Sequence, residues 1–232
     1  VEIPKGVSAK NPAGFYHVLL KVYEGCEVSI RKLNILIGRD DYLIVALKDY
    51  FSGLGNDFFD PCSLSCDSIS SFYNEYGVGS EAIVRRLGVQ IPDGLNAQLP
   101  SGFYHVLLKV YEGCDESIKK INILIYPECL KAALRERFNG DDDDDGVLDV
   151  SKITKLASLK EEFGIGPNDI ANRLNVELPE GLYARNASGF YHVLLRVYEG
   201  CEVSIRKLNV LIYPKCLKAA LRERFNGGDG VL

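Results

Sequence analysis

Three histidines are the side chains of this chain best suited to proton transfer or metal binding. His17, His105 and His192 occupy the same place in three near-identical segments. The neighbour one helical turn after His192 is Arg196, a cation, and no Ser-His-Asp or Cys-His arrangement is evident. A histidine without partner ligands is poor material for a metal site or a catalytic triad. We therefore predict no catalytic residue, no enzymatic activity, no cofactor and no small-molecule substrate.

The seven cysteines follow the same repetition, and their spacing is not that of paired zinc ligands. Cys62 and Cys66 have no second pair of cysteines nearby. The other five are Cys26, Cys114, Cys129, Cys201 and Cys216. An odd number of such thiols is typical of a reducing compartment, so we predict a cytoplasmic protein rather than a disulfide framework.

An acidic run in the middle of the chain partly fits a calcium-binding loop. Asp141, Asp143, Asp145 and Asp149 match acidic positions of an EF-hand, but the twelfth position, normally a glutamate, is Lys152. We therefore interpret the run as a solvated linker and keep these four aspartates only as a weak calcium candidate.

Binding to nucleic acid and insertion into a membrane are both disfavoured. The segment 162–174 resembles a helix-turn-helix and places Asn168, Asn172 and Arg173 on its second helix. The net charge of −5 is, however, the wrong sign for a nucleic-acid binder. No apolar run approaches the roughly 18 residues that a membrane span needs.

The elements that would position these residues come in copies. The segment GFYHVLLKVYEGC at 14–26 recurs at 102–114 and, with one change, at 189–201, at offsets of 88 and 87 residues. A period near 87 residues fits a self-contained domain better than a short solenoid repeat. We predict copies at 1–57, incomplete at its N-terminal side, at 58–147, ending in the acidic linker, and at 148–232.

Apolar residues at spacings of three and four predict amphipathic helices and no strands. In the last copy we expect five helices, and after Pro179 a loop or a short sixth helix. The predicted fold is all-α, with tandem antiparallel six-helix bundles. The predicted core of the last copy includes Phe190, Leu194, Leu208, Leu211 and Leu221.

Four motifs follow one another along the third copy. LKEEFG at 159–164 precedes IGPNDI at 165–170, and Leu195 with Tyr198 precedes Leu208. This order resembles the death domain family, whose first helix ends in Leu-Ala-x-x-Leu-Gly. The second helix of that family opens with a small-polar turn and Asp-Ile, and the fourth carries Leu-x-x-Trp. Tyrosine in place of tryptophan leaves the sister death effector and caspase recruitment domains open as alternatives.

The resemblance implies a non-enzymatic adaptor or scaffold that assembles signalling complexes, such as those of apoptosis or innate immunity. Its partners would be other death-fold proteins, including further copies of itself. Residues at helices that form interfaces in the family are Asp169, Arg173, Arg196, Glu199, Arg206, Lys207, Arg222 and Arg224. The alternative is an extracellular or structural helical repeat protein with weak calcium binding.

The three copies differ in net charge, at 0, −7 and +2 in chain order. Opposite charge on two near-copies of one fold favours contact between the copies, within or between chains. In the incomplete first copy, apolar residues such as Phe15 and Leu36 would lack partners unless residues before Val1 or another chain cover them.

Overall fold

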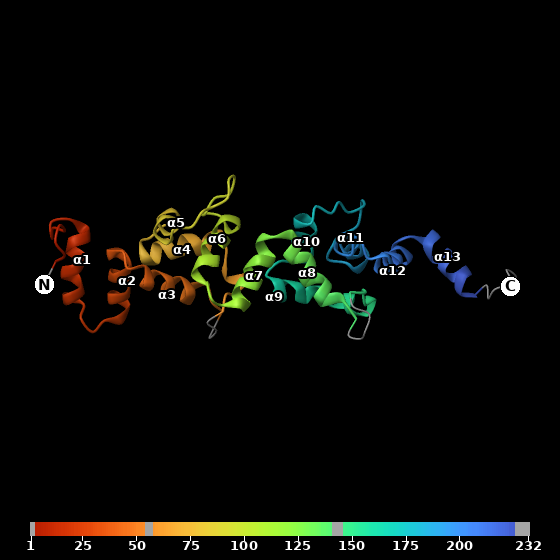
Figure 1. Ribbon diagram of the computed structural model, residues 1–232, viewed down its shortest axis with the longest axis horizontal. Coiled ribbons are helices and arrows are strands. Elements are labelled where there is room, and N and C mark those ends of the chain that lie inside the picture. The colour runs from red at the N-terminus through yellow and green to blue at the C-terminus, as the bar shows by residue number, and fades with distance from the viewer. Residues whose placement is uncertain (1–2, 54–57, 141–145, 226–232) are drawn as a thin grey trace. The chain divides into compact units, whose positions relative to one another are not determined.

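The structure, a computed structural model, describes residues 3–53, 58–140 and 146–225. The chain divides into two compact units, unit 1 at Val1–Ile121 and unit 2 at Asn122–Leu232. Regular structure in the described residues is helical, with two isolated β-bridges and no strand (Figure 1). The all-α prediction is confirmed.

The helices of unit 1 begin with three that belong to the first sequence copy. They are α1 (Pro12–Val22), α2 (Glu27–Ile37), α3 (Asp40–Phe51), the 3₁₀ helix η1 (Pro61–Ser63), α4 (Cys66–Tyr76), α5 (Ser80–Leu87), α6 (Pro100–Val110) and most of α7 (Asp115–Ile125). Unit 2 contains α8 (Pro127–Phe138), the 3₁₀ helix η2 (Val150–Ser158), α9 (Leu159–Phe163), α10 (Pro167–Arg173), α11 (Ala187–Val197), α12 (Glu202–Ile212) and α13 (Pro214–Phe225).

The helices repeat in the order of the sequence copies. The repeated GFYHVLL segment lies in α1, α6 and α11, and the last helix of each copy is α3, α8 or α13. Residues 175–186, where a sixth helix was one of two expectations, form turns and coil. Each of the two later copies therefore has five α-helices in its described residues, and a six-helix bundle is not confirmed.

Local chemistry explains how α6 and α11 begin. Pro100 occupies the first turn of α6, where a backbone N–H would have no partner inside the helix. Gly102 follows because a Cβ at this position would overlap the carbonyl of Asn96. The same close approach occurs between Gly189 of α11 and Tyr183. Glycine at this position therefore lets the preceding turn lie against the helix.

The core of unit 1 is aromatic. α3 packs against α6, and α2 packs against α4. Phe51 lies between Phe72 of α4 and Phe103 of α6, with ring centroids 6.2 Å and 5.4 Å apart. Arg86 of α5 donates to the Ile35 carbonyl at 2.8 Å, which ties α5 to the end of α2.

Unit 2 uses the same plan with fewer aromatic residues. α8 packs against η2 and α11, and Phe138 contacts Phe190 with ring centroids 5.7 Å apart. Arg173, the counterpart of Arg86, donates to the carbonyl of Leu124 at the end of α7. Two helix pairs therefore recur in both units, α3 with α6 and α5 with α6 in unit 1, and α8 with α11 and α10 with α11 in unit 2.

The chain after α3 and after α8 is held by a buried serine. The Phe59 amide donates to Oγ of Ser117 at 3.0 Å, and the Leu148 amide donates to Oγ of Ser204 at 2.9 Å. Both serines and both amide-bearing residues are buried. A buried amide needs such a partner, so this bond anchors the chain at Phe59 in unit 1 and at Leu148 in unit 2.

The boundaries of the packed cores do not coincide with the boundaries of the sequence copies. α3 precedes the predicted boundary at 57 and packs against α6, which follows it. α8 and α11 lie on either side of the predicted boundary at 147 and also pack together. Residue 57 itself lies outside the described residues. Each core therefore combines the last helix of one copy with the first helices of the next.

This offset between cores and sequence copies explains which of the predicted core residues are buried. Phe190, Leu194 and Leu208 are buried, as predicted, but Leu211 and Leu221 are exposed, so those two predictions were wrong. No residue of α13 is buried. The apolar positions of a last helix are covered by the following copy, and α13 has no such copy after it in these residues.

Candidate functional site

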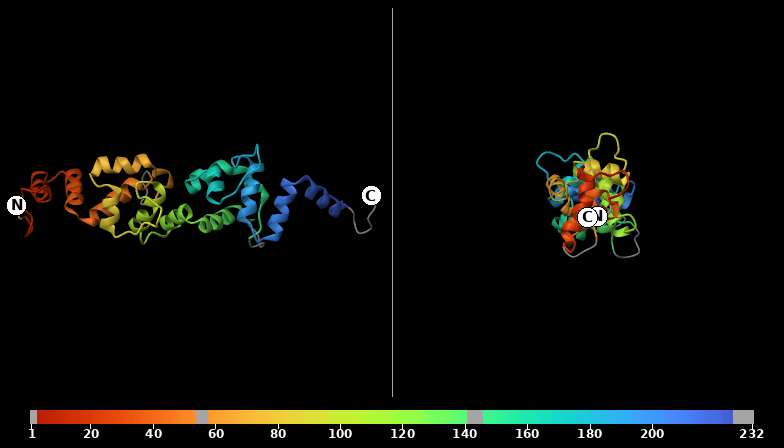
Figure 2. Two further views of the ribbon diagram at one scale, coloured as in Figure 1. Left: turned by 90° about the horizontal axis from the view of Figure 1, so that it is seen from above. Right: turned by 90° about the vertical axis from the view of Figure 1, so that its left-hand side faces the viewer.

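One contact recurs between the last helix of a copy and the helix that carries FYHVLL. In unit 2 this contact joins α8 to α11 (Figures 1 and 2). Leu130, Leu134 and Phe138, spaced by four on α8, are fully buried. Phe138 meets Phe190 with ring planes inclined by 56°. The centre of the contact is therefore apolar.

Polar groups close the edge of this contact. Arg135 donates from Nε to the Val197 carbonyl at 2.7 Å and from Nη2 to the Glu199 carbonyl at 3.2 Å. Its guanidinium lies 6.0 Å from the ring centroid of Tyr198. The Tyr198 hydroxyl donates to Oδ1 of Asn139 at 2.7 Å, and burial raises the pKa of Tyr198. Arg135 thus satisfies carbonyls at the end of α11.

Unit 1 repeats the contact between α3 and α6. Leu47 and Phe51 are fully buried, and Phe51 meets Phe103 with ring planes inclined by 54°. The Tyr111 hydroxyl donates to the Lys48 carbonyl at 3.2 Å, and Nζ of Lys48 lies 5.8 Å from the Tyr111 ring centroid. A phenylalanine pair and a tyrosine beneath a basic side chain therefore mark the contact in both units.

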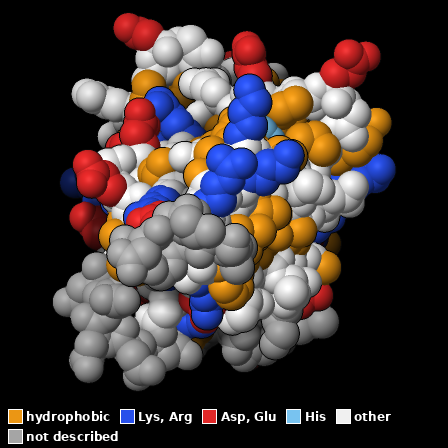
Figure 3. All heavy atoms as spheres, turned by 90° about the vertical axis from the view of Figure 1, so that its right-hand side faces the viewer, with side chains coloured by type: hydrophobic (Ala, Val, Ile, Leu, Met, Phe, Trp, Pro, Cys, Tyr) orange, Lys and Arg blue, Asp and Glu red, His pale blue; other side chains and the backbone are white. Residues whose placement is uncertain are grey.

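The third helix of this type, α13, presents the same residues to solvent. Leu217, Leu221 and Phe225 are 44%, 46% and 62% exposed. On its other side, Ala219 and Ala220 line a groove shared with α12. Figure 3 looks at the side where α13 lies in Figure 1 and shows hydrophobic side chains among Lys and Arg side chains. Exposed apolar surface of this kind is typical of interaction sites.

The first helix, α1, exposes the complementary surface. Phe15 and Tyr23 are 48% and 46% exposed, whereas their counterparts Phe103 and Tyr111 are buried. Among the described residues Phe15 is left uncovered, as expected, whereas Leu36 is only partly exposed. The described residues thus form two filled contacts and, at α13 and α1, leave one copy of each surface uncovered.

Of the eight predicted interface residues, three lie around the exposed stripe of α13. Arg222 and Arg224 are exposed on α13 itself. Arg206 of α12 forms an ion pair with Glu223 of α13, which links the two helices. Whether these residues contact a partner stays a prediction.

Two further candidates form a pair that recurs in every copy. Arg196 and Glu199 are joined at 2.6 Å, and their counterparts Lys109 and Glu112 are joined at 2.5 Å. Such exposed pairs contribute little to stability because water and salt screen them.

The last three candidates have partners inside unit 2. Lys207 donates to the Leu148 carbonyl at 3.1 Å, and Asp169 accepts a hydrogen bond from the Gly166 amide at 3.3 Å. Arg173 binds the end of α7, as described above. These side chains stabilise unit 2, and the structure does not bring them together with Arg222 and Arg224 into one cluster of contacts.

The calcium candidates are only partly described. Asp141, Asp143 and Asp145 lie outside the described residues. Asp149 caps η2, accepting hydrogen bonds from the Ser151 amide at 2.9 Å and its hydroxyl at 2.7 Å, which lower the pKa of Asp149. Asp60 caps η1 in the same way without an acidic run beside it. The role of Asp149 is therefore explained by capping.

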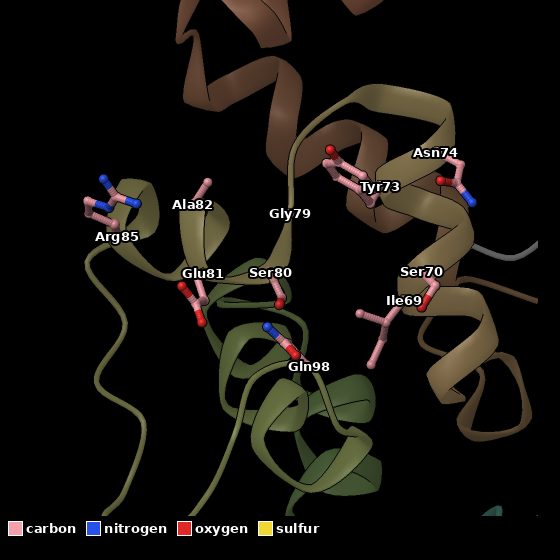
Figure 4. A pocket seen from close by; sticks show the side chains of 10 residues that line it. All are labelled: Ile69, Ser70, Tyr73, Asn74, Gly79, Ser80, Glu81, Ala82, Arg85 and Gln98. Atoms are coloured by element: carbon pink, nitrogen blue, oxygen red, sulfur yellow. The ribbon is translucent and has the colours of Figure 1, made fainter.

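Other sites for chemistry have ordinary structural explanations. Within the described ranges, no three His, Cys, Asp or Glu side chains are placed to hold a metal ion, and no helix could cross a membrane. His105 and His192 are half-buried, and burial lowers the pKa of each. An open groove of about 490 Å³ between α4 and α5 is lined by residues that include Tyr73 and Ser80 (Figure 4). Its lining is not repeated in unit 2.

The sequence analysis did not predict that Leu217 and Leu221 are exposed, and it placed Leu221 in a core. The available signal was that α13 repeats the sequence of α8, whose apolar stripe is covered by the helices that follow it. Comparison of the chain with protein-family models, with curated proteins and with solved structures gives no match.

Proposed function

We propose that this chain is a non-enzymatic scaffold whose helical repeats associate with other helical repeats of the same kind. This is the role that the resemblance to tandem death domains implies, and membership of that family, with its six-helix bundles and cytoplasmic adaptors, is part of the proposal. The partners are other repeats of this type, including those of further copies of the chain, rather than nucleic acid or a small-molecule substrate.

One observation carries the proposal. The same apolar stripe is buried on α8 and exposed on α13, although the two helices have nearly the same sequence. A surface that a repeat buries against its neighbour inside the chain is already shaped for another repeat. Contiguous apolar surface of this kind is unusual on a protein that acts as an inert spacer.

Three titratable groups with shifted pKa values have structural explanations. The pKa of Asp149 is lowered by its capping hydrogen bonds, and the pKa values of Tyr198 and His192 are shifted by burial of their rings. Each of these shifts therefore has an evident structural cause.

The proposal is tested by measuring the mass of the 232-residue protein by light scattering as its concentration rises. A scaffold of self-complementary repeats is expected to gain mass with concentration. A monomer at every concentration and salt level would contradict the proposal and favour the structural spacer.

A further inference from the structure

The two contacts inside the chain share one geometry, although they lie in different units. The phenylalanine at the end of α3 or α8 meets the phenylalanine near the start of α6 or α11 at 5.4 Å and 5.7 Å. The ring planes are inclined by 54° and 56°. Two independent occurrences with closely similar distance and angle indicate that these helix sequences specify this way of docking.

The uncovered helices carry nearly the same sequences as the docked ones. α13 differs from α8 only at Lys215, where α8 has Glu128. α1 differs from α6 only at Ala13, where α6 has Ser101. All the aromatic and basic residues that mark the contact are therefore present in the uncovered pair.

The exposed residues are those that the docked helices bury. Phe225 and Arg222 of α13 correspond to Phe138 and Arg135, and Phe225 is 62% exposed. The stripe of α13 is also turned away from α12, whose side of α13 carries Ala219. Among the described residues of unit 2, none covers Leu217, Leu221 and Phe225 completely.

We infer that α13 of one chain docks onto α1 of a second copy, in the way that α8 docks onto α11. This inference rests on the proposed scaffold function and names its surfaces. Phe225 packs against Phe15 of the other copy, and Arg222 lies over Tyr23 and donates to carbonyls at the end of α1. The contact is head-to-tail, so it leaves one uncovered helix of each kind at the ends of an open oligomer.

Two features set the strength of this contact. Among the described residues α1 packs against α2, whereas α6 and α11 also pack against α5 and α10, so the contact between chains is smaller than the internal one. We therefore expect a dissociation constant on the order of 10 µM or weaker. In addition, Lys215 would lie near Lys21, where unit 2 has Glu128 and Arg196 lining one groove.

This second feature gives a test by gain of affinity. The variant Lys215→Glu makes α13 identical to α8 and replaces a like-charge pair by an opposite-charge pair. Self-association of this variant is expected to strengthen by roughly 3- to 10-fold at low salt. An unchanged or weaker association would count against the proposed register.

The main experiment uses sedimentation velocity with two variants, Phe225→Asp and Phe15→Asp. Each is expected to weaken self-association by at least about 10-fold, since a charge would enter an apolar contact. Mixed together, the two variants should form a dimer and nothing larger, because only one α1 surface and one α13 surface remain competent. Val203→Asp, which alters a comparably exposed apolar residue of α12, should associate like the parent chain.

The outcomes separate this inference from the proposed function. If the parent chain associates and Phe225→Asp does so equally, the inference is wrong while the scaffold function stands. If Phe15→Asp alone keeps full association, α13 pairs with α13 and the head-to-tail contact is refuted. Association that disappears as salt rises would likewise overturn the apolar contact in favour of the charged residues. Unchanged thermal unfolding of each variant shows that the folded units are intact.

Discussion

Two leucines at equivalent positions of α8 and α13 test most directly whether a core combines the last helix of one copy with the first helices of the next. Leu134 of α8 and Leu221 of α13 have the same neighbours in sequence, but Leu134 is fully buried and Leu221 is 46% exposed. Both lie in unit 2, so a change at either site acts on the unfolding of the same unit. The two variants Leu134→Ala and Leu221→Ala therefore differ only in the packing that surrounds them.

The expected magnitudes follow from this burial. Leu134→Ala removes a fully buried side chain and leaves a cavity, so it should lower the free energy of unfolding by about 2–5 kcal/mol. Leu221→Ala removes apolar surface that is half solvated and leaves no cavity, so we expect a loss of about 1 kcal/mol or less. The test depends on the ratio between the two losses of unfolding free energy, rather than on either value alone.

The measurement is urea unfolding followed by circular dichroism, at a protein concentration low enough to keep the chain monomeric. At higher concentration, docking of α13 would stabilise the parent chain and make the Leu221→Ala loss larger, because binding to the folded state adds to its stability. Equal losses for the two variants at low concentration would refute the assignment of α8 to a packed core and α13 to the surface.

Three further predictions concern hydrogen bonds and ions. Ser204→Ala leaves the buried Leu148 amide without its acceptor and should lower the free energy of unfolding by about 1–3 kcal/mol. Ser29→Ala, at the partly exposed equivalent position, should change it little in the same urea experiment. Hydrogen bonds from Ser29 lower the pKa of Cys26, so Ser29→Ala should raise that pKa and slow alkylation of Cys26 at neutral pH, measured by mass spectrometry across a pH series. Calorimetric titration with calcium should show at best about millimolar affinity, and micromolar binding would contradict the linker interpretation of residues 141–149.

Local sequence patterns predicted the helices well because they depend on near neighbours. The break at Tyr213-Pro214 falls where α12 ends and α13 begins, since proline disfavours helix at the residue before it. The apolar spacing through Phe190 and Leu194 marked the buried face of α11. The turns at 175–186 were left open between loop and helix, because no capping or periodic signal favours either one there.

The candidate site could not be located in the same way, because a repeated sequence does not specify which of its copies is covered. Leu134 and Leu221 stand in identical local sequences, so any rule that reads only neighbouring residues must assign them the same burial. What separates them is that η2 and α11 follow α8 along the chain and pack onto it. Burial in a repeat protein therefore depends on the presence of the next copy. It follows that a surface suited to binding can have the sequence of a core, and we propose the exposed stripe of α13 as such a surface.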